Sequence, residues 1–333
     1  MNIKVPIGKG LWRRVSLLGF LIIICCVLVL SCTDESIPTY TSPAVGTDWE
    51  LRAEGVASRL TGIAWNGEVF AVVGDSSVFT SADARTWQLR YGSAPGELHT
   101  VCWSGKEFIA VGDGCILVSE DGITWRLTEV GEALNGVAAS DTMAVAIGDS
   151  GVVLTSHDLV TWRKDHCTYG SLTAIIWDSN FVYPQYDSCG AFVLCGEGIV
   201  ARYRRLEETA QFTRIGGDYG WMGLVERGSI VVLASYFYCF GIMGTSGHIT
   251  GNCVGSKFRA ITPFGKEFVA VGTGGWAINL VLVGDAPGAV GLGGVRYRTP
   301  VESNLNAITV AGNGCVAVGD DGVVVASPPN RSK

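Results

Sequence analysis

The sequence has little of what metal binding and acid–base catalysis usually require. Only four histidines occur among 333 residues, and they are scattered along the chain, at His99, His157, His166 and His248. No two cysteines have C-x-x-C spacing, and no cluster of histidine and cysteine has the spacing of a zinc site. No serine, histidine and aspartate are spaced in a way that suggests a catalytic triad. We therefore expect no metal, no cofactor and no catalytic residue.

Positive charge is also scarce. The chain has 24 lysines and arginines against 31 aspartates and glutamates, a formal net charge of -7, and its basic residues are dispersed. An acidic domain gains no free energy from releasing the counterions of a phosphate backbone. We therefore expect no nucleic acid among its partners.

The chain has one long apolar run, and it lies near the N-terminus. A basic stretch precedes the run at residues 17–30, which ends shortly before Cys32. This order is typical of a secretion signal, which we assign to residues 1–31. Residues 28–32 resemble the lipobox of bacterial lipoproteins, which implies a lipid on Cys32 and, with Thr33 after it, sorting to the outer membrane. Ordinary cleavage of the signal and its retention as an anchor are the alternatives.

One short motif recurs after the signal. The pattern S-x-D-x-x-T-W begins at Ser81, Ser119 and Ser156, so its copies are 38 and 37 residues apart. Self-similarity at a period of this size predicts a fold that repeats one small unit.

Each repeat consists of four short runs rich in valine, isoleucine, phenylalanine and tryptophan. In the first repeat these runs are Leu60–Trp65, Glu68–Asp75, Ser77–Ser81 and Thr86–Arg90. Asparagine, glycine and aspartate separate the runs, which predicts antiparallel hairpins rather than helices. Four strands per repeat indicate the blade of a β-propeller.

The repeats predict an all-β fold, a seven-bladed β-propeller over residues 47–327, with four-stranded antiparallel blades. Because the fourth to sixth copies are irregular, six and eight blades remain alternatives. The last copy stops after its third strand, and Asp48–Arg52 resembles Thr86–Arg90. We therefore expect this N-terminal strand to complete the last blade and close the ring. Residues 32–46 would form a tether, and residues 328–333 a C-terminal tail.

The S-x-D-x-x-T-W motif resembles the Asp-box, or BNR, repeat of sialidases and of many non-enzymatic propellers, including photosystem assembly factors of the Ycf48 type. The resemblance implies that each motif is a hairpin turn between the third and fourth strands. Its serine and aspartate would hold backbone N–H groups, and its tryptophan would pack into the blade. The residues in these roles are Ser81, Asp83 and Trp87, Ser119, Asp121 and Trp125, and Ser156, Asp158 and Trp162.

The chain departs from sialidases where catalysis is concerned. A sialidase uses an arginine cluster, a tyrosine paired with glutamate and an acidic aspartate, and an F/Y-R-I-P motif precedes its first box. The nearest string here, Tyr297-Arg298-Thr299-Pro300, lies at the far end of the chain. We therefore expect a propeller without enzymatic activity.

Two features direct attention to the face opposite the Asp-boxes. In five repeats the turn between the second and third strands carries a carboxylate, at Asp75, Asp113, Asp149, Glu197 and Asp320. These residues are either turn formers, which tight hairpins favour, or a ring that binds a cation or a basic partner segment. The fifth repeat carries an aromatic run that is either an exposed binding patch or core, at Tyr236, Phe237, Tyr238 and Phe240.

The cysteines suggest one crosslink. A compartment outside the cytoplasm permits disulfides, and Cys167 and Cys189 flank the irregular start of the fourth repeat. We predict that these two are paired. Cys102, Cys115 and Cys315 fall inside strand runs, where we expect them to act as small buried hydrophobes.

Together these patterns favour a lipid-anchored propeller of the bacterial cell envelope that binds another envelope protein, as a scaffold or assembly factor. The membrane contact would come from the lipid on Cys32. A glycan-active enzyme or a carbohydrate-binding module of the sialidase type is the alternative, because fold alone does not decide function.

Overall fold

The structure is a computed structural model, which describes residues 48–166, 170–182, 189–197, 199–206, 209–216, 221–227, 230–235, 239–243, 249–253, 257–265, 267–283 and 291–328. Regular structure in these ranges consists of strands and two short 3-10 segments, η1 (Asp149–Gly151) and η2 (Thr273–Gly275). The all-β prediction is therefore confirmed. Within the same ranges, no helix is long and apolar enough to cross a membrane. The expected signal, the tether and Cys32 lie outside the described residues.

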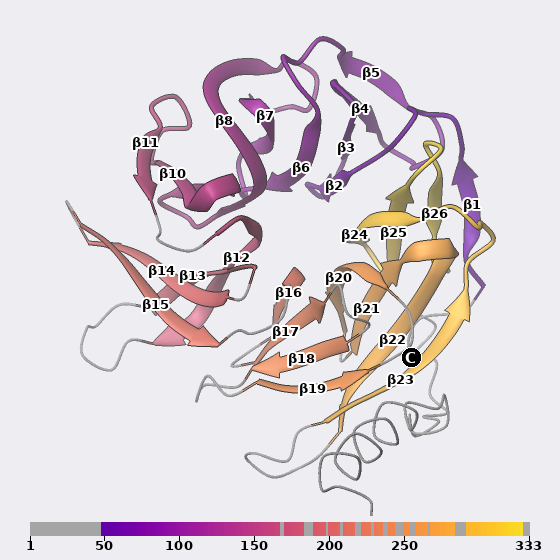
Figure 1. Ribbon diagram of the computed structural model, residues 1–333. Helices are drawn as coiled ribbons and strands as arrows, with labels where there is room; N and C mark the ends of the chain where they lie inside the picture. Colours follow the sequence, from indigo (N-terminus) through magenta and orange to yellow (C-terminus); the bar gives the residue numbers. More distant parts are fainter. Residues whose placement is uncertain are drawn as a thin grey trace, which may run out of the picture. The chain divides into compact units, whose positions relative to one another are not determined.

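Five sheets have four antiparallel strands each (Figure 1). One consists of β2 (Gly62–Trp65), β3 (Phe70–Gly74), β4 (Ser77–Ser81) and β5 (Gln88–Tyr91). Another consists of β12 (Leu172–Val182), β13 (Cys189–Gly196), β14 (Ile199–Leu206) and β15 (Thr209–Gly216). A third consists of β16 (Trp221–Arg227), β17 (Ile230–Ser235), β18 (Cys239–Met243) and β19 (Ile249–Cys253).

The other two four-stranded sheets come from the C-terminal part of the chain and one N-terminal strand. One is formed by β20 (Phe258–Phe264), β21 (Glu267–Gly272), β22 (Trp276–Val283) and β23 (Gly291–Arg298). The other is formed by β24 (Leu305–Ala311), β25 (Gly314–Gly319), β26 (Val324–Ala326) and β1 (Glu50–Ala53). In Figure 1 the indigo β1 lies beside the yellow β26, and Glu50 pairs with Ala326.

The remaining sheet has six strands, which corrects the expected count of seven four-stranded blades. Its strands are β6 (Leu98–Trp103), β7 (Phe108–Ser119), β8 (Arg126–Ala139), β9 (Ala144–Gly148), β10 (Val152–Ser156) and β11 (Arg163–His166). The difference arises because β7 and β8 are long and change partner midway. The first half of β7 pairs with β6 and the second half with β8, whose own second half pairs with β9. The described strands therefore form six sheets.

The contacts between first strands return to their starting point. β2 contacts β6, β6 contacts β8, and β8 contacts β12. The series continues through β16, β20 and β24, and β24 contacts β2. A circular series of antiparallel sheets, each built from strands close in sequence, is a β-propeller.

The core lies between neighbouring sheets. Every residue of β3, β9, β10 and β21 is buried. Because both faces of these strands are covered, their sequences are continuous apolar runs instead of alternating ones. One cluster joins Val73 and Val78 of one sheet to Leu98 and Phe108 of the next. Burial of such side chains stabilises a fold by about 25 cal/mol per Å² of apolar surface.

A β-bulge recurs near the start of the first strands. In β6 the pairing with β7 shifts between Leu98 and Thr100, so that His99 is the extra residue. The same shift follows four other buried residues at the corresponding position, Leu134, Leu172, Phe258 and Leu305. A bulge bends the strand and changes the direction of the extra side chain. In each of these strands, the residue that follows the buried apolar residue is therefore not part of the regular pairing with the second strand.

A glycine ends the partner strand near each bulge. A Cβ added to Gly112 would lie 2.0 Å from the carbonyl oxygen of Glu97, where no side chain fits. A Cβ added to the corresponding glycine of five other strands would also lie within 2.1 Å of a carbonyl oxygen. These glycines are Gly74, Gly148, Gly196, Gly272 and Gly319. The glycine of the recurring second-strand motif is therefore required by the close approach of two backbone segments.

We expect Gly112→Ala to lower the free energy of unfolding by about 1–3 kcal/mol, because the methyl group would overlap the backbone at Glu97. Gly170→Ala is the matched control, since its added Cβ would meet only Glu197 Oε2, at 3.4 Å. The control should change stability by less than about 0.5 kcal/mol. Urea unfolding of the two variants measures both values, and equal midpoints would contradict the steric argument.

Candidate functional site

The three S-x-D-x-x-T-W loops join the third and fourth strands of their repeats. Asp83 lies between β4 and β5, and its Oδ1 accepts hydrogen bonds from the Ser81 hydroxyl at 2.9 Å and from the N–H groups of Arg85 and Thr86 at 2.8 Å. The other two loops have the same pattern, with Ser119 and Asp121 before β8 and with Ser156 and Asp158 before β11. The serine and aspartate of each loop are therefore hydrogen-bonded within the loop.

The tryptophans of these loops lie against the blades. The ring of Trp87 is 6.4 Å from that of Phe70, and the ring of Trp125 is 6.2 Å from that of Phe108. Trp125 also donates its indole N–H to Gly122 O at 3.1 Å. Trp162 packs beside an apolar cluster of neighbouring strands. These contacts give the nine motif residues a structural role.

The fourth position of each loop adopts a left-handed conformation. Its φ is 57° at Ala84, 71° at Gly122 and 57° at Leu159. Glycine adopts this conformation without strain, whereas alanine and leucine do so at a cost of about 1 kcal/mol or more. The hydrogen bonds of the aspartate offset that cost, so the turn forms in all three loops although only one of them has a glycine there.

Four of the carboxylates predicted at the second-to-third-strand turns directly follow the end of a strand, whereas Asp113 lies within the long β7. Asp75 accepts from the Ser58 N–H at 3.1 Å, and Asp113 lies 3.1 Å from His99 Nε2. Asp149 accepts from an asparagine side chain at 2.9 Å. Glu197 is exposed. The carboxylates with these partners act as local hydrogen-bond acceptors, as turn residues do.

Polar side chains at the bulges connect neighbouring first strands. Asn135 donates to Asp149 and also, at 3.0 Å, to the carbonyl of Leu172 in β12. Thr61 donates to Leu98 O of β6 at 2.6 Å, and Asn306 donates to Leu60 O at 2.8 Å. The hydrogen bonds to the carbonyls of Leu172, Leu98 and Leu60 each cross from one repeat to the next. These hydrogen bonds form a series along the first strands of the repeats, on the face of the propeller where the second strands end.

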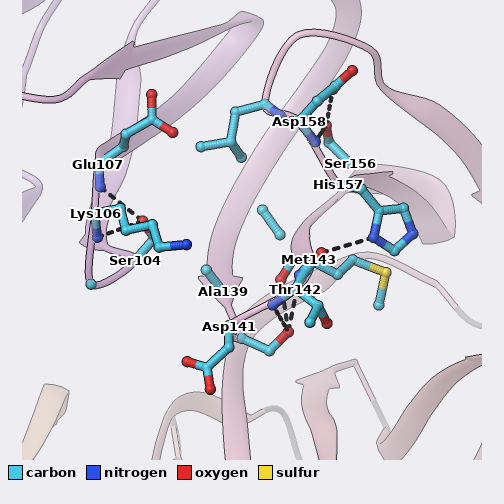
Figure 2. Close-up of a pocket in the computed structure, with 14 residues that line it drawn as sticks. Ser104, Lys106, Glu107, Ala139, Asp141, Thr142, Met143, Ser156, His157 and Asp158 are labelled. Carbon is cyan, nitrogen blue, oxygen red and sulfur yellow. Dashed lines mark hydrogen bonds between the residues drawn. The ribbon is translucent and has the colours of Figure 1, made fainter.

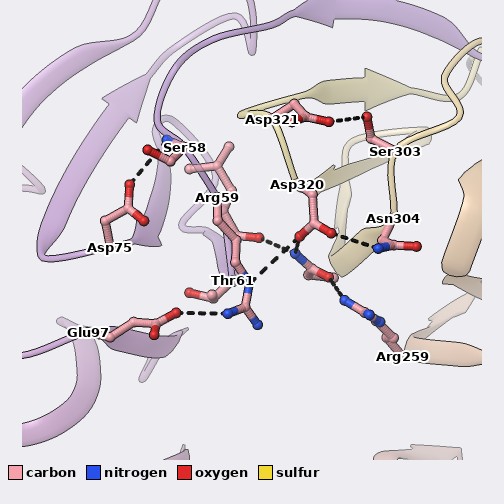
Figure 3. A network of polar contacts seen from close by, with 12 residues as sticks. Ser58, Arg59, Thr61, Asp75, Glu97, Arg259, Ser303, Asn304, Asp320 and Asp321 are labelled. Atoms are coloured by element: carbon pink, nitrogen blue, oxygen red, sulfur yellow. Dashed lines mark hydrogen bonds and ion pairs between the residues drawn. The ribbon is translucent and has the colours of Figure 1, made fainter.

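The most extensive part of this series is a charged network around Asp320, which follows β25 (Figure 3). Asp320 accepts from Asn304 at 2.7 Å and from Asn306 at 2.8 Å. Arg59 lies between two carboxylates, 3.0 Å from Glu97 and 3.7 Å from Asp320.

Arg259 of β20 extends the network by donating to the side-chain oxygen of Asn306. The network therefore joins four sheets, through β20, the loop before β2, the turn after β25 and Glu97, which precedes β6. It is also accessible, because the side chains of Arg59, Glu97 and Asp320 are 49%, 37% and 30% exposed.

The network holds Asp320 in its charged form. Burial alone would raise the pKa of Asp320, but the hydrogen bonds from Asn306 and Asn304 and the charges of Arg259 and Arg59 outweigh it. Its pKa therefore lies below the ordinary value for aspartate. The face presents charged groups of both signs, which is suited to recognition of a charged partner.

The opposite side of the propeller carries a pocket of about 350 Å³ between two repeats (Figure 2). The β6–β7 turn with Lys106, the β8–β9 turn with Asp141 and the third S-x-D-x-x-T-W loop form its walls. His157 of that loop donates from Nδ1 to the carbonyl of Thr142 at 2.8 Å. The residues that line the pocket include no phenylalanine, tyrosine or tryptophan.

Several other predicted residues are only partly covered by the structure. Tyr236, Phe237 and Tyr238 lie outside the described residues, and Phe240 lies in β18, opposite Ala234 and Asn252. Cys189 begins β13, but Cys167 lies outside the described residues, so their pairing stays a prediction.

Three cysteines of the strand runs are free thiols in the structure. Cys115 and Cys315 are buried, and Cys102 is partly buried. Burial raises the pKa of Cys102 and of Cys315 to about 12, which leaves both as neutral thiols. In the part of the chain that the structure describes, no three histidine, cysteine, aspartate or glutamate side chains form a group that could hold a metal ion.

The polar residues of the bulges were not identified from the sequence. The usable signal is a buried apolar residue followed by a polar one, repeated with the period of the blades. The pairs are Leu60-Thr61, Leu98-His99, Leu134-Asn135, Leu172-Thr173, Phe258-Arg259 and Leu305-Asn306. Their side chains differ, so the shared position emerges only when the strands are aligned in three dimensions.

Comparison with known proteins supports the fold. No protein-family model matches the chain, and no curated protein matches it in sequence. A chain in the crystal structure of the mitotic checkpoint complex is similar, with a TM-score of 0.67, 11% sequence identity and coverage of 87% of this chain and 96% of that chain. At this identity the similarity shows a shared β-propeller fold and nothing more specific.

We expect the pKa of Asp83 to be about 2 in the native protein and to rise toward 3.8 in Ser81→Ala. Hydrogen bonds from the N–H groups of Thr86 and Arg85 are the largest causes of the low pKa, and the Ser81 hydroxyl adds to them. Because the N–H groups remain, the variant should not reach 3.8.

The sign of the effect on stability follows from the lowered pKa. The charged form of Asp83 stabilises the fold at pH above about 4, and this contribution is lost as pH falls from about 4 to about 2. Carboxyl ¹³C NMR titration measures the pKa directly. Asp158, whose pKa is also about 2, is the internal control and should not change. An Asp83 pKa that is the same with and without the Ser81 hydroxyl would contradict the assignment.

Proposed function

We propose that this chain is a non-catalytic, lipid-anchored propeller of the bacterial cell envelope, and that it binds another envelope protein as a scaffold or assembly factor. Cys32 would carry the lipid and residues 32–46 the tether, with sorting to the outer membrane. The pairing of β1 with β26 supports a ring closed by the N-terminal strand. The Asp-box loops would act in this ring as structural turns.

The observation that carries the proposal is the charged network around Asp320. Arg59 is about half exposed and is shared by two carboxylates that belong to different repeats. Exposed ion pairs of this kind contribute little to stability, about 0–1 kcal/mol. Across an interface, however, charged groups set orientation and partner choice. The network therefore supports a protein-binding face where the inner strands begin.

The glycan-binding alternative would use the pocket at Lys106, Asp141 and His157. That pocket is within the usual size range for small ligands. Its lining has no phenylalanine, tyrosine or tryptophan ring on which a sugar could stack. Protein binding is therefore the better supported of the two functions.

We expect Arg59→Ala to reduce the recovery of a stoichiometric partner at least tenfold while leaving the thermal unfolding of the propeller nearly unchanged. The partner is measured by mass spectrometry of the proteins that copurify with the full chain from gently solubilised membranes. Lys106→Ala is the matched control, because it removes one positive charge on the pocket side.

Two results would oppose the proposal. Absence of any stoichiometric partner from the unaltered chain would contradict the scaffold function. A partner that Arg59→Ala retains and Lys106→Ala loses would place the binding face on the pocket side instead.

A further inference from the structure

The turn between β21 and β22 differs from its counterparts in charge. It carries Thr273 and two glycines at the end of the second strand, where five other repeats carry a carboxylate. Its backbone is tied to the charged network, since Gly274 N–H donates to Asn304 at 3.0 Å. This end of the β20–β23 sheet therefore borders the network but lacks the acid found in the other turns.

Two arginines lie against the tryptophan that follows this turn. Trp276 pairs with Arg298 across β22 and β23, and Arg296 is two residues away on the same strand, so all three side chains lie on one face of the sheet. The guanidinium carbon of Arg296 is 4.5 Å from the ring centroid of Trp276, and that of Arg298 is 4.7 Å away. These distances are those of cation–π contacts.

Arg298 retains its hydrogen-bonding capacity in this arrangement. A guanidinium that packs its flat face on an aromatic ring keeps its N–H groups in its own plane, directed away from the ring. Arg298 is exposed, and no ion pair in the described part of the chain involves it. Glu302 is also exposed and takes part in none of these ion pairs. In the described part of the chain, Trp276 therefore lies against an exposed Arg298 that forms no ion pair with a carboxylate.

A second arginine lies at the inner end of the same sheet. Arg259 is on β20, the innermost strand, and Arg298 is on β23, the outermost. Strands are spaced by about 4.8 Å, so the two positions are separated by roughly 14 Å across the sheet. An extended peptide advances about 3.3 Å per residue and covers this separation with four to five residues.

We propose that this end of the β20–β23 sheet binds a short acidic segment of a partner protein, with one carboxylate on the Trp276-stacked Arg298 and another near Arg259. Arginine holds a carboxylate by two parallel hydrogen bonds, which a fixed guanidinium favours. The acidic turns of the other repeats repel the same segment and direct it to this sheet. The proposal rests on the proposed protein-binding function and adds the chemistry of the partner.

The test uses the full chain in detergent and a fluorescein-labelled eight-residue peptide of alternating glutamate and glycine. Binding is followed by fluorescence anisotropy at 50 mM and 200 mM salt, roughly bracketing physiological screening. We expect the same peptide with glutamine in place of glutamate to bind at least tenfold more weakly. Arg298→Ala and Trp276→Leu should each weaken binding of the glutamate peptide about tenfold, since a charge-assisted hydrogen bond is lost or no longer held in place.

Two further variants separate geometry from charge. Arg298→Lys keeps the charge but loses the planar fork, and it should also weaken binding severalfold. Lys106→Ala removes a charge on the pocket side and should leave binding unchanged. Thermal unfolding of each variant checks that the propeller is intact, and an altered Trp276→Leu fold leaves the two Arg298 variants to decide.

The following results would overturn the proposal. The first is equal binding of the glutamate and glutamine peptides, and the second is unchanged binding in folded Arg298→Ala. The third is complete displacement of the peptide by inorganic phosphate at the same concentration of charge, which would indicate a simple anion site. Failure here is distinguishable from failure of the proposed function. A copurified partner that folded Arg298→Ala retains would refute the acidic-segment site alone, whereas peptide binding without any copurified partner would refute the scaffold function alone.

Discussion

The close approach of a glycine to the backbone before β2, β6, β12, β20 and β24 and within β8 is the constraint on which the charged face depends. Gly112 lies against the carbonyl of Glu97, and the bulge at His99 occurs beside this contact. A larger residue would push the two segments apart and remove the room in which the bulge forms. Because the bulge turns one polar side chain out of each ladder, the glycine indirectly positions the residues that join neighbouring repeats.

Side chains on the two faces of the propeller differ in where they form their hydrogen bonds. The serine and aspartate of the S-x-D-x-x-T-W loops form hydrogen bonds within their own loop, as Asp83 does with Ser81 and two backbone N–H groups. At the bulges, by contrast, side chains such as Asn135 reach the next repeat. The first arrangement fixes the residue types, and the second tolerates threonine, asparagine, histidine or arginine. Among the three repeats that carry the motif, the residue after the buried leucine changes from Thr61 to His99 to Asn135, whereas the serine, aspartate and tryptophan of the loops are the same.

The sequence predicted the β-propeller because its signals are local. The S-x-D-x-x-T-W turns and the valine-rich runs depend on neighbours within one repeat. The count of seven four-stranded blades was wrong because β7 and β8 continue through positions that were expected to be turns. Whether a strand ends or bends at residues such as Asp113 depends on its pairing partners, which a pattern of residues does not specify.

The network around Asp320 was beyond prediction for a related reason. Asp320 itself was identified as a turn carboxylate, but its partners Arg59 and Arg259 come from opposite ends of the propeller sequence. Contacts between first and last repeats arise only when the series of sheets returns to its start. Long-range ion pairs of this kind are not indicated by any repeating pattern in the sequence.

The nature of the partners of each carboxylate determines the charge pattern of the face. Asp75 and Asp149 accept hydrogen bonds from neutral donors, a backbone N–H and an asparagine, rather than from a cation. Asp320 is balanced by arginines, and the adjoining β20–β23 sheet has no acid at its turn. The face is therefore negative around part of its rim and positive at one sheet. Such a polarised surface orients a charged partner before contact and disfavours the reverse orientation.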